Sequence, residues 1–184
     1  MEKSKLLNII RLHKKWLESN GVLGKKADLR GANLRGAILG NVDLRWANFR
    51  GADLGGADFR GANLEETNFR GADLGEAIFR GVNLKGANLR GANLRGADIG
   101  GANFVKTNLR GSELRGADMY GANFREADLG GANLVEANLR EVNLEGANLK
   151  GADFKDATLD FTTKRLLPQN SFCPLSNCFH RPNN

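Results

Sequence analysis

From Ala27 to Leu159 the sequence repeats every five residues without an insertion or deletion, which gives 27 consecutive units. Each unit has a large apolar residue at its centre, first at Leu29, then at Leu34 and at every fifth position onward. A small residue, usually Ala, stands two places before the centre. A period of five matches neither the 3.6-residue period of a helix nor the two-residue period of a strand. We therefore expect a chain that turns a corner in every unit, with both apolar residues inside.

The polar positions of the unit flank its centre. Asp or Asn fills most positions before the centre, and Arg or Gly most positions after it, so we expect these side chains to face water. Gly occupies the second position after the centre in 17 units. A type II turn needs a positive φ at its third residue, and Gly adopts that conformation without a steric cost. The pattern predicts a turn of this kind at each corner.

Tandem units of the form Ala-Asp/Asn-Leu-X-X resemble the pentapeptide-repeat protein family. The match covers 133 of 184 residues, and only Ile38, Ile78, Glu113 and Thr158 replace the usual Asp or Asn. The resemblance implies an all-β solenoid, a right-handed quadrilateral β-helix with four units in each coil. Twenty-seven units would then make nearly seven coils, a stack roughly 30 Å tall at the spacing of neighbouring strands.

The sequence itself supports a coil of four units. If positions 20 apart lie on one face, the column that follows the centres from Leu29 onward has a basic residue in six of seven places, each followed by Gly. The basic residues are Arg30, Arg50, Arg70, Arg90, Arg110 and Lys150. The other three columns are mixed, and a period of 15 would scatter this one.

The N-terminal residues 1–22 are predicted to form an amphipathic capping helix over residues 2–19, ended by Asn20 and Gly21. Its apolar side is made of Leu6, Ile9, Ile10, His13, Trp16 and Leu17. An open solenoid end needs a cap, so we expect Trp16 and Leu17 to contact the first coil. The alternative is a helix that lies on a membrane surface, because the segment is rich in basic residues. These are Lys3, Lys5, Arg11, Lys14 and Lys15.

The solenoid is predicted to span residues 23–160. The segment that follows it, 161–184, is predicted to be a C-terminal cap and a disordered tail. Its three prolines, Pro168, Pro174 and Pro182, argue against a regular element. In the family that this chain resembles, the C-terminal end can mediate a homodimer. The tail also contains Cys173, Cys178 and His180. Their spacing is unlike that of zinc sites, so we expect free thiols, no metal and no cofactor.

Charge is divided unevenly along the chain. Residues 1–26 sum to +5, residues 160–184 to +2, and residues 27–159 to −1. A neutral body argues against a nucleic-acid partner, which requires a basic surface. No apolar run exceeds three residues, and the N-terminus lacks the core of a signal peptide. We therefore expect a cytoplasmic protein without a membrane span.

The basic column has two interpretations. Its face sums to +4 and the next face to −3, so the column could bind an anionic partner. Alternatively, four of the basic residues could pair with an acid three residues later and be neutralised, which we favour because exposed ion pairs form at little cost. Those acids are Asp53, Asp73, Glu113 and Asp153.

No catalytic constellation is recognisable, and an enzyme is not expected. The primary hypothesis is a protein-interaction scaffold of unknown partner. The first alternative is a DNA gyrase-binding modulator, as the family resemblance implies, but a mimic of DNA needs a strongly negative surface. The second is a binder of anions or nucleic acid through the basic column.

Overall fold

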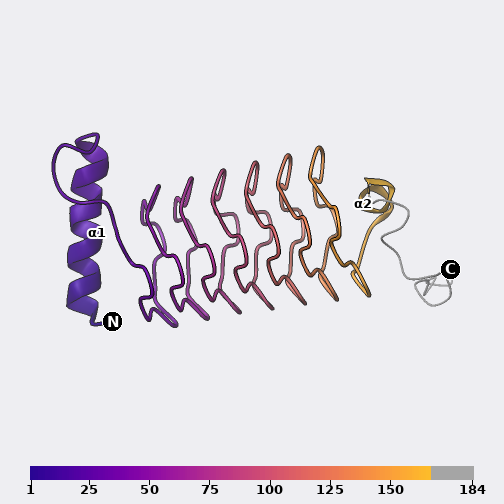
Figure 1. The fold of residues 1–184 in the computed structure, drawn as a ribbon, viewed down its shortest axis with the longest axis horizontal. Coiled ribbons are helices and arrows are strands. Elements are labelled where there is room, and N and C mark those ends of the chain that lie inside the picture. Colours follow the sequence, from indigo (N-terminus) through magenta and orange to yellow (C-terminus); the bar gives the residue numbers. More distant parts are fainter. Residues whose placement is uncertain (167–184) are drawn as a thin grey trace.

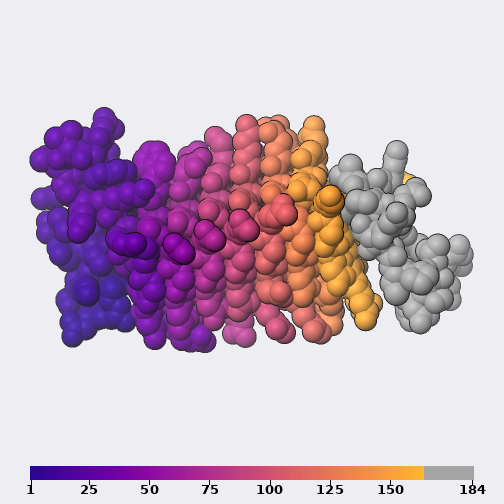
Figure 2. Space-filling model, in the orientation of Figure 1, coloured from indigo at the N-terminus to yellow at the C-terminus, as the bar shows by residue number. Residues whose placement is uncertain are grey.

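The computed structural model describes residues 1–166, with side chains as far as residue 163. It contains two helices, α1 (Lys3–Glu18) and α2 (Phe161–Leu166), at opposite ends of a stack of coils (Figure 1). Residues 27–159 wind through these coils, which appear as successive bands of side chains in the space-filling view (Figure 2). The molecule is therefore an elongated stack in which neighbours along the axis are one coil apart in sequence.

Successive coils pair through parallel bridges between residues 20 apart. The described residues contain no continuous strand, because the chain turns after every bridge. Each bridge uses the position before the unit's centre, starting with Asp28 and Asn48. The Leu29 amide donates to the Asn48 carbonyl at 2.7 Å, and the Asn48 amide donates to the Ala27 carbonyl at 2.9 Å. The same residues pair up the whole stack, so positions 20 apart form columns, as the basic column predicted.

The core is a column of central residues on each side, packed against the small residues of the units. Phe49 stacks on Phe69 with ring centroids 5.0 Å apart, and Phe59 stacks on Phe79 at 4.8 Å. The two stacks meet edge to face, with Phe49 and Phe59 6.3 Å apart. These are the offset and T-shaped arrangements that aromatic rings prefer. A thin core of this kind is filled by one large and one small residue per unit.

A left-handed residue makes every corner. At nearly every corner the amide of the unit's small residue donates to the carbonyl of the preceding centre, as between Ala52 and Phe49 at 2.9 Å. The second residue after the centre has a positive φ at all 26 corners, from Gly31 at 60° to Asp156 at 56°. Seventeen of these residues are Gly and nine are not, so the turn predicted from Gly also forms where Gly is absent. Trp46, with φ 61°, is the bulkiest exception.

The N-terminal end of the stack is covered by α1 (Figure 1). The apolar side of α1, with Leu6, Ile9 and Ile10, packs against the core. His13 is fully buried, and its Nδ1 accepts a hydrogen bond from the Ala27 amide at 3.1 Å. Because this side of α1 is occupied, it is not available to lie on a membrane.

The C-terminal end contains a helix that the sequence did not predict. α2 begins after Asp160, whose carboxylate accepts hydrogen bonds from the Thr163 amide at 2.7 Å and from the Glu141 amide. The second bond replaces a carbonyl of the next coil, as in the bond from Gly121 to Arg140 at 3.0 Å. The prediction of no regular element was wrong here because the prolines begin only at Pro168, beyond α2. The predicted disordered tail lies outside the described residues.

Candidate binding surface

The residues before and after each centre form the outer surface of the coils. Asp or Asn at the first position was expected to face water, but most of these side chains are half-buried. Their Oδ1 accepts a hydrogen bond from the backbone amide two residues later, for example from Arg60 to Asp58 at 2.9 Å and from Arg70 to Asn68 at 3.0 Å. This short-range bond is typical of Asp and Asn in turns, and it explains why either residue serves.

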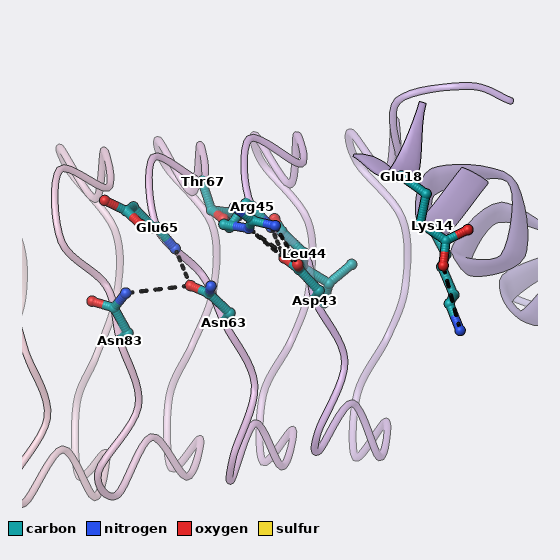
Figure 3. A network of polar contacts seen from close by, with 9 residues as sticks. All are labelled: Lys14, Glu18, Asp43, Leu44, Arg45, Asn63, Glu65, Thr67 and Asn83. Carbon is teal, nitrogen blue, oxygen red and sulfur yellow. Dashed lines mark hydrogen bonds and ion pairs between the residues drawn. The ribbon is translucent and has the colours of Figure 1, made fainter. Parts of the chain in front are cut away.

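Asn side chains also connect neighbouring coils. Asn83 donates through Nδ2 to Oδ1 of Asn63 at 3.3 Å, while Thr67 donates its hydroxyl to the Leu44 carbonyl at 2.9 Å (Figure 3). Sequence reasoning missed the hydrogen bonds of Asn side chains between coils, because it expected the residue before each centre to face water. The period of 20 combined with an unbroken Asn column was the feature that could have identified it.

Every Arg that follows an Asp by two residues folds back onto that Asp. Arg45 binds Asp43 through Nε and a terminal nitrogen, the latter at 2.7 Å (Figure 3). Arg60 binds Asp58 in the same way at 2.6 Å. The hydrogen bonds from the Arg60 side chain are the main reason that the pKa of Asp58 lies below its usual value. The third such pair is Arg30 with Asp28, at 2.7 Å.

Other Arg residues reach the acidic side chain of the next coil. Arg35 follows Asn33 and binds Asp53, the residue stacked on Asn33 in the next coil, at 3.3 Å. Arg80 follows Ile78 and binds Asp98, which is stacked on Ile78 in the same way, at 3.0 Å. Arg35 and Arg80 are therefore each neutralised by an Asp in the stacked unit of the next coil.

Four successive Arg residues have no ion pair in the described part of the chain. They form what we call the basic face: Arg50, Arg70, Arg90 and Arg110. All four are exposed. The residues two places before them are Asn48, Asn68, Asn88 and Asn108. For the first three Arg residues, the stacked unit of the next coil therefore also offers Asn in place of Asp.

Arg110 differs only in its neighbour in the next coil, Asp128. That carboxylate accepts hydrogen bonds from the Gly130 amide at 3.0 Å and from Asn148 Nδ2 at 2.8 Å. Of the other two residues of the predicted basic column, Arg30 is paired with Asp28, and Lys150 is exposed beyond the gap left by Gly130.

The ion pairs expected around the corner, with the acid three residues later, do not form among the described residues. Asp53 binds Arg35 of the previous coil instead. Asp73 and Glu113 accept hydrogen bonds from Asn93 at 2.8 Å and Asn133 at 2.9 Å. These acids are directed to the neighbouring coils on their own face, because bridged residues stand one strand spacing apart. The expected neutralisation of the column was therefore wrong.

The predicted capping residues lie beside the first coil. Trp16 stacks on His13 with centroids 5.8 Å apart and meets Trp46 edge to face at 6.1 Å. Burial lowers the pKa of His13, although the Asp43 carboxylate and the Arg45 carbonyl oppose this shift. Leu17 is half-buried.

Residues 1–166 contain no group of three His, Cys, Asp or Glu side chains that could hold a metal ion. Cys173, Cys178 and His180 lie outside the described residues. No helix in the described part of the chain has the length and apolar character needed to cross a bilayer.

The repeat identifies the family. A family model for pentapeptide repeats matches residues 27–65, 57–96, 92–131 and 122–160. The chain belongs to the pentapeptide-repeat family. Proteins of this family fold as right-handed quadrilateral β-helices, which is the fold that the resemblance implied. None of the curated proteins matches the sequence.

Several solved structures are similar to this pentapeptide-repeat protein. HetL, involved in heterocyst differentiation regulation in the cyanobacterium Nostoc sp. strain PCC 7120, is 33% identical over 72% of each chain, with a TM-score of 0.46. A pentapeptide repeat protein of the Arabidopsis thaliana thylakoid lumen is 30% identical over 77% of this chain and 74% of that one, with a TM-score of 0.42. QnrB1, a plasmid-mediated fluoroquinolone resistance protein, is 24% identical over 76% of this chain and 93% of that one, with a TM-score of 0.32.

Proposed function

We propose that this pentapeptide-repeat protein is a non-enzymatic scaffold that binds an acidic surface of another protein through its basic face. The observation that carries the proposal is the row of four exposed Arg residues, Arg50 to Arg110, without an ion pair in the described part of the chain. Elsewhere on the coils, most Arg residues have an acidic partner within the chain.

The positive charges of the row repel one another, and no ion pair in the described part of the chain offsets this repulsion. Its guanidinium groups are anchored one strand spacing apart, about 4.8 Å. Two like charges at about 4 Å repel by about 1 kcal/mol in water, and less in salt. A row of carboxylates on a partner would remove this repulsion. Arg suits that role because its planar group binds a carboxylate through two parallel hydrogen bonds.

The shape of the face also supports binding. Each Arg is followed by a Gly at the corner, and a Cβ at Gly51, Gly71, Gly91 or Gly111 would meet no atom within 4 Å. Other faces have Glu or Lys at the same left-handed position, for example Glu66. Larger residues are therefore tolerated there, and Gly leaves this corner bare and open to a partner.

An acidic protein fits the basic face better than a nucleic acid does. The outward residues of this face are Arg, Asn and Gly, and none is an aromatic side chain on which a base could stack. The next face, with Asp53 and Asp73, sums to −3 and would repel the flanks of a long polyanion. A compact acidic patch can contact the row without meeting that face.

Binding to two probes at several salt concentrations tests the proposal. The probes are polyglutamate, as a model acidic polypeptide, and a short DNA duplex. Replacing Arg50, Arg70 and Arg90 by Gln should weaken polyglutamate binding about tenfold to a hundredfold, since each exposed pair contributes about 0.5–1 kcal/mol. The matched control replaces Arg60, Arg80 and Arg140 by Gln, which removes the same charge from another face.

Equal weakening in both variants would reduce the effect to net charge and contradict the proposal. Binding of DNA but not polyglutamate, lost in the first variant only, would assign the basic face to a nucleic acid instead. We do not extend the proposal to DNA gyrase, because residues 27–159 sum to −1 and no face is strongly negative.

We also infer that α1 is the cap of a β-helix of nearly seven coils that spans residues 23–160. The buried His13 and the edge-on contact of Trp16 with Trp46 support this role, and Leu17 would complete it. Deletion of residues 1–22 should expose the first coil and cause aggregation or a large loss of thermal stability. A deletion variant that stays monomeric with an unchanged Tm would contradict the inference. A homodimer through the C-terminal end stays a prediction.

A further inference from the structure

Two large apolar side chains project into solvent from the loop that follows α1. Val22 is 81% exposed and Leu23 is 64% exposed, whereas the Leu side chains from Leu29 to Leu149 are all buried in the coils. Leu7, on the outward side of α1, is 56% exposed. Three such residues at one end of the molecule need an explanation, because single exposed apolar residues are common but groups of them mark interaction sites.

The loop has a defined structure that holds these side chains outward. Ser19 Oγ accepts a hydrogen bond from the Leu23 amide at 2.8 Å, and the Gly21 amide donates to the Trp16 carbonyl at 2.8 Å. At Gly24 φ is +76°, and a Cβ there would lie 2.2 Å from the Leu12 carbonyl oxygen. Only Gly fits so close to α1. The loop is thus packed on the helix while Val22 and Leu23 remain uncovered.

The same end of the molecule is strongly basic. Residues 1–26 contain seven basic and two acidic side chains, and all seven basic residues are exposed. One ion pair is found among them, between Lys14 and Glu18 at 3.7 Å (Figure 3). The seven are Lys3, Lys5, Arg11, Lys14, Lys15, Lys25 and Lys26.

The geometry points to an anionic lipid membrane as the partner of this N-terminal end. We propose that Val22 and Leu23 enter the membrane interface while the surrounding Lys side chains contact the headgroups. Leu7, Arg11 and Lys14 share one exposed side of α1 at spacings of four and three residues, next to the side that packs on the core. The outward surface of α1 therefore combines with the loop into one basic and partly apolar end.

The composition of this end favours a membrane over a protein partner. Six of the seven basic residues are Lys, which is depleted at protein interfaces. Lys contacts a diffuse anionic surface well, and its flexible stem reaches the headgroups. Membrane binding that lasts needs two contributions, such as apolar insertion and a basic patch, and both are present here.

This proposal uses different residues from the basic face and does not depend on it. α1 lies across the end of the stack, so the coils would extend away from the bilayer (Figure 1). The side of the stack, including Arg50 to Arg110, would then remain accessible to a protein partner.

Vesicle flotation of the full chain tests the proposal. The vesicles contain phosphatidylcholine alone, or phosphatidylcholine with about one-third phosphatidylserine, in about 0.1 M salt. We expect at least tenfold more bound protein on the anionic vesicles. Val22→Ser with Leu23→Ser, and separately Lys14→Gln with Lys15→Gln and Lys25→Gln, should each reduce binding about tenfold.

Two matched controls should bind as the natural chain does. Ile38→Ser removes an apolar side chain that is 84% exposed on the coils. Arg50→Gln with Arg70→Gln and Arg90→Gln removes three charges from the basic face. The proposal is overturned if anionic vesicles do not float the protein, or if the loop variant binds normally. It is also overturned if the loop variant changes the oligomeric state on gel filtration and lipid binding is absent.

Discussion

Arg60 and Arg70 occupy the same position in their units, yet one is paired and the other is free. Asp58 precedes Arg60 and binds its guanidinium at 2.6 Å, whereas Asn68 precedes Arg70, which has no ion pair in the described residues. In both units the side-chain oxygen also accepts the backbone amide of the Arg, at 2.9 and 3.0 Å. Asp and Asn are thus equivalent for the turn but opposite for the charge that follows it.

The comparison extends along the two columns. Arg80, which lacks an Asp in its own unit, reaches Asp98 in the next coil. On the basic face the next coil offers Asn88 to Arg70 instead. A run of Asn in one column therefore removes both partners at once. The choice between Asp and Asn before each centre therefore sets the charge of a whole face, although both residues make the same hydrogen bond in the turn.

The largest expected effect comes from restoring the missing acids. Replacing Asn48, Asn68 and Asn88 by Asp should pair Arg50, Arg70 and Arg90 within their units and weaken polyglutamate binding at least tenfold. Exposed pairs of about 0.5–1 kcal/mol each would account for that loss. Titration by fluorescence anisotropy would measure it.

The control for this triple substitution replaces Asn63, Asn83 and Asn103 by Asp. It adds the same charge at the same turn position on another face, where Glu, Lys and Val follow in place of Arg. The loss of binding free energy for polyglutamate should then be less than half of the loss in the variant with Asp at 48, 68 and 88. If both triple variants lose affinity equally, pairing within the unit is not the cause.

A smaller effect separates the turn from the charge. Asn68→Ala should lower the free energy of unfolding by about 1 kcal/mol, because the Arg70 amide loses its acceptor. Asn68→Asp keeps that acceptor and should leave the free energy within about 0.5 kcal/mol of the natural chain. Urea unfolding followed by circular dichroism would distinguish them, and equal stability of Ala and Asn variants would refute a role in the turn.

The paired unit should also respond to acid. The pKa of Asp58 is lowered by hydrogen bonds from Arg60, so its contribution to stability is present above pH 3.8 and is lost as the pH falls through the lowered value. Asp58→Asn should therefore reduce the loss of stability between neutral and strongly acidic pH. Asn68→Asp should add a similar loss. Thermal unfolding at a series of pH values tests both directions, and no change in either variant would argue against the pairs in solution.

The smallest expected effect is on the Tm of two variants that each lose one Arg. Arg60→Gln removes a paired cation and should lower the Tm slightly, whereas Arg70→Gln relieves repulsion in the row and should leave the Tm unchanged or raise it. The difference should shrink in concentrated salt. Scanning calorimetry of the two variants at low and high salt would measure it, and a lower Tm for Arg70→Gln would contradict the free state of that residue.

Much of the fold follows from the order of residues alone. The five-residue period places Leu29 and its successors inside, and the basic column already indicated that residues 20 apart share a face. The positive φ predicted from Gly31 and similar residues was also found. These features are local or periodic, so each unit carries the same information and the units reinforce one another.

Only the tertiary structure decided which charges are free. The sequence suggested that Arg50 would bind Asp53 around the corner, but Asp53 binds Arg35 of the previous coil. The stacking of coils brings the matching units of neighbouring coils within one strand spacing, and that proximity outweighs closeness in sequence across a turn. The same holds at the N-terminal end, where Leu6 and Ile9 pack on the core while Val22 and Leu23 are exposed. Repeated local geometry fixed the coil, while contacts between coils and at their ends determined the surface.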